Sequence, residues 1–440
     1  MALYLFFQVL LHLTQDSREL PAMATAVPFI SPILGMMKGN SRYYNYLRDK
    51  YSEPIFTLRL PFTRLYIVTS PSLIPAVQRQ SRVLSFNLVQ LRAVTNFASS
   101  SKRAIDLVTK NIDNDEGFVP GFLKAVYPTL TGDMLDTLNQ KTVNVILTAF
   151  DKMAAADEQI TYATTDAIYG PHNPLRDPEN LSACQRSQGP HVSVQEVRGV
   201  LRTGPTPLAG SDYIQRRRAY MRESGLLAED VARIKLTGVF PLIGNTIPTT
   251  FWLVYHIVSS PIVLEDCRRE ALQAVSERGG VCTLDASFIK DSFSRFHGMG
   301  TSVRLALEDH MLDGKYLIKK GGMVMISGRV QQSSPSLWGR TPGSERHNPV
   351  AFRGFGGGTT LCPGRHLATT EIPAGTASSG GPCPPKDKSS QASAMDQPGH
   401  DISIELWPRP KQNWRVVFPS KADNKTRIVA EDIQAFQLDK

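Results

Sequence analysis

A single cysteine, Cys362, lies in the stretch FGGGTTLCPGRHLA, which runs from Phe355 to Ala368. Three consecutive glycines precede the cysteine, and Gly364 follows it. Glycine adopts backbone conformations that are closed to other residues and lets a flat ligand approach the chain closely. The next residues, RHLATTEI, are typical of a helix start, where backbone N–H groups stabilise a thiolate. The stretch therefore predicts a thiolate held in a glycine-walled loop.

Such a thiolate can act as a nucleophile or can bind a metal. A nucleophile needs a positioned base, and His366, as a neighbour on the same helix, would face elsewhere. A lone thiolate is a poor zinc site, whereas haem iron takes one cysteine as its proximal ligand. The alternative that remains open is a glycine-rich structural turn with an inert cysteine.

The stretch FGGGTTLCPG closely resembles the haem-binding signature of cytochrome P450 enzymes. The four fixed positions of that signature are filled by Phe355, Gly358, Cys362 and Gly364. The resemblance implies a mainly α-helical fold with small β-sheets, which is P450-like but incomplete. It also implies haem b as cofactor, with Cys362 as the axial ligand to iron, Phe355 shielding the sulfur, and both glycines permitting the loop.

The resemblance extends in order along most of the chain. The segment PIFTLRLPFTRLYIVTS alternates like a β-hairpin and looks like the N-terminal sheet of the family. The segment TSVRLALED looks like the strand whose arginine, here Arg304, reaches a haem propionate. The segment DISIELWPRPKQNWRVVFP looks like the C-terminal strands and predicts a second hairpin.

The apolar run around GNTIPTTFW looks like the long helix that crosses the distal face of the haem. Asn245 and Thr246, followed by Pro248, stand where most members have an acid–threonine pair. This arrangement is similar to the sterol 7α-hydroxylase and prostacyclin synthase branch and to many filamentous-fungal members. The resemblance implies that Asn245 and Thr246 line the oxygen site, although an Asn cannot relay protons as an acid does. A capped helix break beside Gly244 is the alternative.

The implied reaction inserts one oxygen atom from O2 into a lipophilic, sterol-like substrate, with electrons from a reductase partner. The thiolate would favour O–O cleavage by donating electron density. Two other functions remain open. One is a degenerate or wrongly assembled member that binds haem without turnover, and the other is a haem isomerase that needs no reductase.

Several family features are missing. The Glu-x-x-Arg motif keeps Arg295, but Ser292 stands in place of the glutamate, which leaves a buried arginine without its partner. The aromatic–Arg loop is absent between Trp338 and Arg353, and the helix after Cys362 stops at Ile372. These abrupt gaps predict a mis-spliced or degenerated coding sequence.

The composition is ordinary for a globular chain: 440 residues, 41% hydrophobic and 20% charged. The net charge of +9 suits an acidic reductase or an anionic membrane surface. We expect no nucleic-acid partner, because no zinc-finger or RNA-binding signature occurs. Five scattered cysteines without a CxxC pair predict reduced thiols and a cytosolic setting.

The N-terminal run MALYLFFQVLLHLTQD is too short for a transmembrane helix and lacks a basic region before it. It predicts either a segment that dips into a membrane surface or a helix docked on its own domain. The family resemblance and this run together place the chain at the cytosolic face of the endoplasmic reticulum membrane.

Five regions are expected along the chain. They are an N-terminal apolar segment with an extended Pro-rich connector over 1–35, a haem domain with gaps over 36–372, a disordered low-complexity segment over 373–399, a C-terminal hairpin of the same domain over 400–419 and a polar tail over 420–440. Helices are expected over 132–155, over IQRRRAYMRESGL and over SPIVLEDCRREALQAVSE, and a DGK turn predicts a hairpin after residue 309.

Overall fold

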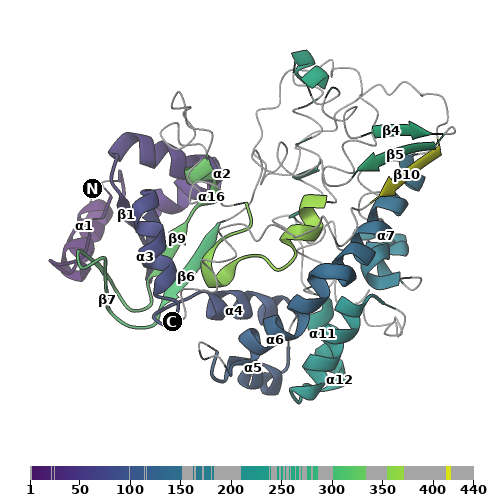
Figure 1. Ribbon diagram of the computed structural model, residues 1–440. Helices are drawn as coiled ribbons and strands as arrows, with labels where there is room; N and C mark the ends of the chain where they lie inside the picture. The colour runs from purple at the N-terminus through teal and green to yellow at the C-terminus, as the bar shows by residue number, and fades with distance from the viewer. Residues whose placement is uncertain are drawn as a thin grey trace.

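In the computed structural model of the protein, helices predominate and the sheets are small, which confirms the predicted fold class (Figure 1). The described residues are 2–150 except 21, 24, 99, 113 and 115; 162, 165–170, 173–179 and 181–182; 210–236 and 238; 245–246 and positions 249, 250, 253, 257, 259–262, 264–266 and 269; 275–278 and 281–285; 301–332; 354–370; and 413–417. The expected Ser292–Arg295 motif, the 373–399 segment and the polar tail lie outside them.

The largest sheet has five strands in the order β1-β2-β9-β6-β3. The strands are β1 (Ile55–Leu60), β2 (Thr63–Val68), β9 (Met323–Ile326), β6 (Ser302–Ala306) and β3 (Leu84–Ser85). β1 and β2 form the predicted antiparallel hairpin, with Ile55 opposite Val68. β9 runs parallel to β2, so this sheet joins segments from the two halves of the chain.

Side chains that alternate along β1 and β2 pack on opposite faces of this sheet. Ile55 and Tyr66 belong to a core with α3 (Ile74–Arg79), whereas Phe56 and Ile67 belong to a core with α2 (Ile30–Tyr51). This alternation is the period-2 pattern that predicted the strands. The sheet is therefore covered on both faces, and it forms a fixed base for the loops at its edge.

The DGK turn is a hairpin, as predicted. It joins β7 (His310–Leu312) to β8 (Tyr316–Ile318), with Leu312 opposite Tyr316. Three residues link the strands, and the first two, Asp313 and Gly314, have left-handed backbones with φ values of 52° and 66°, which Gly and Asp adopt more readily than most residues.

A helical part of the molecule lies beside the sheet (Figure 1). Its helices include α4 (Phe86–Ala98), α5 (Lys102–Thr109), α6 (Phe118–Val126), α7 (Gly132–Phe150), α11 (Asp212–Glu223) and α12 (Ala228–Leu236). The predicted helices from residue 132 and over IQRRRAYMRESGL are confirmed as α7 and α11. One core joins α4, α5, α11 and α12, while α7 contributes to a second core that includes Leu367.

A three-stranded sheet has the order β10-β5-β4, formed by β10 (Asn413–Val417), β5 (Val281–Asp285) and β4 (Val275–Arg278). The prediction of one helix over SPIVLEDCRREALQAVSE is wrong at its end, because Val275 begins a strand. Arg278 pairs with Val281, so the sequence Gly279-Gly280 links β4 to β5, and Gly-Gly is a two-residue hairpin signal. β10 pairs in parallel with β5, while the other strand of the predicted C-terminal hairpin lies outside the described residues.

The Pro-rich connector is not extended throughout. Met23 N–H donates to the Thr57 carbonyl at 3.0 Å, in keeping with an extended segment there. However, α2 begins at Ile30, so the prediction is wrong for residues 30–35. Pro32 lies in the first turn of α2, where its missing N–H leaves no helical bond unmade.

The N-terminal run forms α1 (Ala2–Thr14), which docks on its own domain. The rings of Phe7 and Phe29 lie 5.9 Å apart, and Arg59 Nη2 donates to Thr14 Oγ1 at 2.7 Å. Within the part of the chain that the structure describes, no helix is long and apolar enough to cross a membrane.

A buried carboxylate, Glu19, fixes this docking. Its side chain forms ion pairs with Arg59 and Arg64, and Tyr66 Oη donates to Glu19 Oε1 at 2.7 Å. Burial, followed by the charge of Arg64, lowers the pKa of Arg59, and Glu19 opposes this shift. Glu19 is therefore a counter-charge that two arginines share at the sheet surface.

We predict that Glu19→Gln destabilises the protein by about 3–5 kcal/mol, because it leaves buried arginines without a counter-charge. Glu223→Gln is the matched control, since Glu223 pairs with Arg216 on the exposed surface, where the loss should stay below about 0.5 kcal/mol. Urea unfolding of the wild-type protein and both variants measures the two losses in unfolding free energy. Equal losses would contradict the role given to Glu19.

Candidate active site around Cys362

Cys362 lies at the end of a loop that one backbone hydrogen bond closes. The Cys362 N–H donates to the Phe355 carbonyl at 3.0 Å, and the 3₁₀ turn η7 (Gly358–Thr360) lies between them. Residues 365–370 are helical, so the predicted helix start after the cysteine is confirmed. Figure 1 shows this light-green segment between the five-stranded sheet and α7.

Two glycines of the loop have left-handed backbones, with φ of 81° at Gly356 and 61° at Gly358. A Cβ at Gly358 would lie 3.3 Å from atoms of Gln78, on α3, and a Cβ at Gly356 would lie 3.1 Å from the Thr360 carbonyl. The sequence predicted that the glycines make room for a ligand. At these two positions the close neighbours are protein atoms, so glycine is required by the turn and by packing on α3.

The Cys362 thiol is a free, partly buried group. Burial raises the pKa of the Cys362 thiol, while the Gly364 N–H, which donates to its sulfur, and the charge of Arg365 oppose this rise. The N–H support that the sequence predicted therefore comes from Gly364. A Cβ at Gly364 would meet only this sulfur, at an ordinary 3.9 Å.

Arg304 reaches the same loop from β6. Its side chain is 1% exposed, and it donates to the Leu84 carbonyl at 3.3 Å and to Thr360 Oγ1 at 3.4 Å. Thr360 Oγ1 in turn donates to the Gly357 carbonyl at 2.9 Å. Through Thr360, Arg304 is thus connected to the loop segment that contains the four signature residues Phe355, Gly358, Cys362 and Gly364.

Arg365 is a functional candidate that the sequence reasoning missed. It is 7% exposed, and it donates to the Cys362 carbonyl at 3.2 Å and to Tyr127 Oη at 2.8 Å. The sequence feature that could have indicated Arg365 is its place directly after Pro-Gly, where a helix begins. Tyr127 is far away in the sequence, and no local pattern connects the two.

The predicted distal residues are only partly interior. Thr246 is 6% exposed, whereas Asn245 is exposed, and both have π-helical geometry. Such irregular turns occur often at functional sites. Thr250 Oγ1 donates to the Thr246 carbonyl at 2.9 Å. Among described residues, the hydrogen bonds of Thr246 connect it to its own helix and not to the Cys362 loop.

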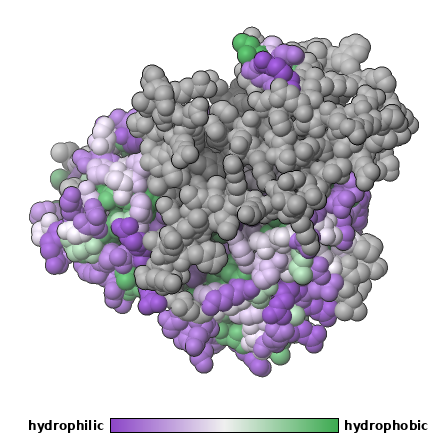
Figure 2. Space-filling model, in the orientation of Figure 1, coloured by the Kyte–Doolittle hydropathy of each residue, from purple (hydrophilic) through white to green (hydrophobic). Residues whose placement is uncertain are grey.

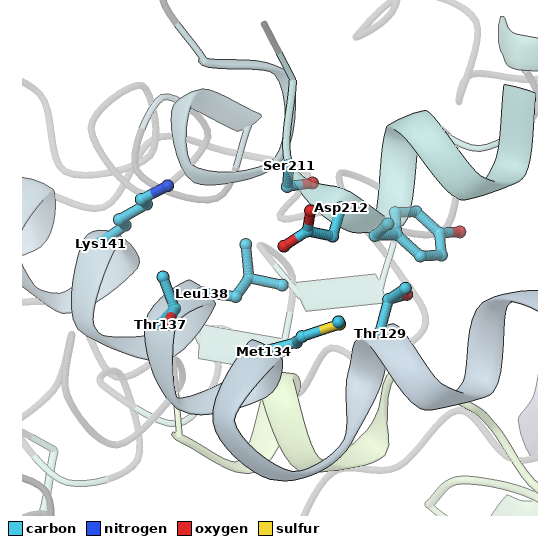
Figure 3. Close-up of a pocket in the computed structure, with 8 residues that line it drawn as sticks. Thr129, Met134, Thr137, Leu138, Lys141, Ser211 and Asp212 are labelled. Atoms are coloured by element: carbon cyan, nitrogen blue, oxygen red, sulfur yellow. The ribbon is translucent and has the colours of Figure 1, made fainter.

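A pocket lies between α7 and the start of α11 (Figure 3). Its lining consists of Thr129, Met134, Thr137, Leu138, Lys141, Ser211, Asp212 and Tyr213. Figure 3 shows Met134 and Leu138 on one side and Asp212 on the other. No residue of the predicted site lines it, so this pocket is separate from the Cys362 loop.

A family model described as cytochrome P450 matches residues 243–378. The cytochrome P450 monooxygenase nodJ of Hypoxylon pulicicidum is 29% identical over 423 residues, which cover 81% of either chain. A cytochrome P450 monooxygenase of Gibberella zeae is 24% identical over 426 residues, with 82% of this chain and 80% of that protein covered. Cytochrome P450 7A1 of Rattus norvegicus is 26% identical over 211 residues, 37% of this chain and 42% of that protein.

The family match contains the whole Cys362 loop, and the two fungal matches extend far beyond it. Over most of its length the chain is therefore similar to cytochrome P450 enzymes. The two fungal relatives are named monooxygenases, which are oxidoreductases, and this is the enzyme class of the chain.

The site residues fit the haem iron that a cytochrome P450 binds. Within the described ranges, no group of three His, Cys, Asp or Glu side chains could hold a metal ion. Cys362 is therefore a lone protein donor there, and it suits an iron whose other ligands come from a macrocycle. The Gly364 N–H at the sulfur suits a bound thiolate, because hydrogen bonds to sulfur tune such ligands.

We predict that Gly358→Ala destabilises the protein more than Gly314→Ala. Both positions have φ above 60°, so each alanine costs about 1–2 kcal/mol from backbone strain. Only Gly358 has a close neighbour, Gln78, which adds a packing cost of roughly 1 kcal/mol. Urea unfolding measures the difference. Adding Gln78→Ala to Gly358→Ala should remove the extra loss, and an unchanged loss would contradict this packing.

Proposed function

We propose that this protein is a cytochrome P450, a haem-thiolate monooxygenase that inserts one oxygen atom from O2 into a lipophilic, sterol-like substrate. One observation carries the proposal: the lone Cys362 thiol is held in a closed loop, with the Gly364 N–H at its sulfur. Haem, when bound, supplies the activation of dioxygen. The chain itself must hold the iron, exclude water, and orient the substrate.

Each signature residue has a part in this function. Cys362 would be the axial ligand, and Phe355, whose carbonyl closes the loop, would shield its sulfur from water. Gly358 keeps the loop close to α3, and the Gly364 N–H donates to the sulfur. Arg304 would neutralise a haem propionate, since its buried guanidinium lies at the loop beside Thr360.

Asn245 and Thr246 would line the oxygen site on the distal side. The π-helical geometry at these residues and the burial of Thr246 support this placement. The Thr246 carbonyl accepts from Thr250, and the Thr246 hydroxyl would hold a water on the distal side. Asn245 would hold a water by hydrogen bonding rather than supply a proton as an acid does.

The sterol-like substrate rests on the names of relatives. Cholesterol 7-alpha-monooxygenase of Cricetulus griseus is 27% identical over 167 residues, 29% of this chain and 33% of that protein. Type I difference spectra with a panel of sterols and fatty acids test it. A spectral shift with fatty acids and none with sterols would contradict it.

A reductase would supply the electrons, and the basic net charge of +9 suits an acidic electron donor. Product formation that depends on reductase and NADPH separates a monooxygenase from a haem isomerase. Isomerised product without a reductase would contradict the proposal.

We also propose contact with a membrane surface through α1. Its outward face carries Leu5, Phe6, Val9 and Leu13, each more than half exposed, and the helix contains no Asp, Glu, Lys or Arg. In Figure 2, apolar patches interrupt the hydrophilic surface of the part that contains α1. Leu5→Ser with Val9→Ser should reduce sedimentation with phosphatidylserine-containing vesicles. Unchanged sedimentation would contradict the contact.

The central test is the spectrum of the reduced, CO-treated protein. A properly bound thiolate gives a strongly red-shifted Soret band, and Cys362→Ala should abolish it. Cys184→Ala is the control, because that cysteine lies outside the signature, and the band should survive. A band that persists in Cys362→Ala would contradict the assignment of the ligand. A wild-type protein that binds haem but forms no product would indicate a degenerate member.

A further inference from the structure

A second arginine, Arg365, holds the Cys362 loop from the side of α7. The residue begins the helical stretch 365–370, directly after the loop. Its guanidinium makes two hydrogen bonds of different kinds. Arg365 Nη1 donates to the carbonyl of the ligand residue itself, Cys362, at 3.2 Å, and Arg365 Nη2 donates to Tyr127 Oη at 2.8 Å.

Tyr127 is the fixed end of this connection. It begins the 3₁₀ turn η2 (Tyr127–Leu130), and α7 follows almost directly. The guanidinium carbon of Arg365 lies 5.8 Å from the centre of the Tyr127 ring, so a cation–π contact adds to the hydrogen bond. Leu130 and Leu367 belong to the same core cluster, which holds the turn and the helix together.

The Cys362 carbonyl belongs to the peptide that directly follows the ligand residue. A donor on this carbonyl limits rotation of that peptide, and so it limits the direction in which the sulfur points. Since Arg365 is 7% exposed, water competes only weakly for this hydrogen bond.

We propose that Arg365 and Tyr127 are positioning residues that keep Cys362 in the orientation of an iron ligand. The proposal rests on the haem-thiolate function given above. Arg304 holds the other end of the loop through Thr360, so the ligand lies between two buried arginines on different elements. Arg365 acts on the ligand residue directly, whereas Arg304 acts on the turn before it.

A purely structural anchor would change stability alone, whereas a positioning residue changes the ligand as well. Tyr127→Phe removes only the hydroxyl. Arg365→Lys keeps the positive charge but replaces the planar guanidinium, which donates to two acceptors at once, by a single ammonium group. Tyr220→Phe is the matched control, because Tyr220 Oη donates to the Phe118 carbonyl at 3.0 Å in a core away from the loop. All are compared as full-length, haem-loaded proteins.

Two measurements are made on each variant: the ratio of red-shifted to unshifted Soret band in the reduced CO complex, and the midpoint of urea unfolding. Loss of a charge-assisted hydrogen bond should lower the band ratio roughly tenfold in Tyr127→Phe and Arg365→Lys. Tyr220→Phe should keep the wild-type ratio, with an unfolding midpoint close to that of Tyr127→Phe.

Three outcomes would overturn the proposal. The first is a wild-type band ratio in Tyr127→Phe and in Arg365→Lys, which leaves the haem-thiolate function intact. The second is an equal fall in Tyr220→Phe, which means that any loss of packing loosens the ligand. The third is a wild-type protein without the red-shifted band, in which case the proposed function fails and the positioning role fails with it. If Tyr127→Phe does not fold, Arg365→Lys decides by itself.

Discussion

The backbone hydrogen bond from the Cys362 N–H to the Phe355 carbonyl determines where the Cys362 thiol points. Closing the loop costs backbone entropy, and left-handed residues are needed to turn it so tightly. Gly356 and Gly358 provide those conformations. The tight turn also brings the loop against Gln78 of α3, so that the sheet and its covering helix support the ligand.

Two buried arginines connect the Cys362 loop to the rest of the fold by hydrogen bonds. A buried guanidinium is costly unless its donors are used, so each arginine fixes the groups that accept from it. Arg304 connects the loop to β3 through the Leu84 carbonyl, and Arg365 connects it to η2 through Tyr127. The loop is therefore held between the five-stranded sheet and the helical part of the molecule.

Local patterns in the sequence were enough to predict the parts of the fold that local interactions form. The β1–β2 hairpin, the DGK turn and the helix after Cys362 follow from alternation, turn residues and spacing. The strand at Val275 was mistaken for helix because its alanine- and glutamate-rich neighbours favour helix, whereas the Gly279-Gly280 pair and its partner β5 favour a hairpin.

Contacts between distant segments could not be predicted from local patterns. Glu19 holds α1 on the sheet through Arg59 and Arg64, which lie far along the chain. Nothing in the spacing of either segment indicates that they pair. Arg365 and Tyr127 are a similar case, since their partnership exists only after the core around Leu367 has formed.

The central claim is that Cys362 supplies the sulfur that holds the iron. X-ray absorption at the iron edge of the haem-loaded, ferric protein tests it most directly, because it identifies the atoms in the first coordination shell. The account predicts one sulfur scatterer in the wild-type protein and none in Cys362→Ala. A first shell of only nitrogen and oxygen in the wild-type protein would contradict it.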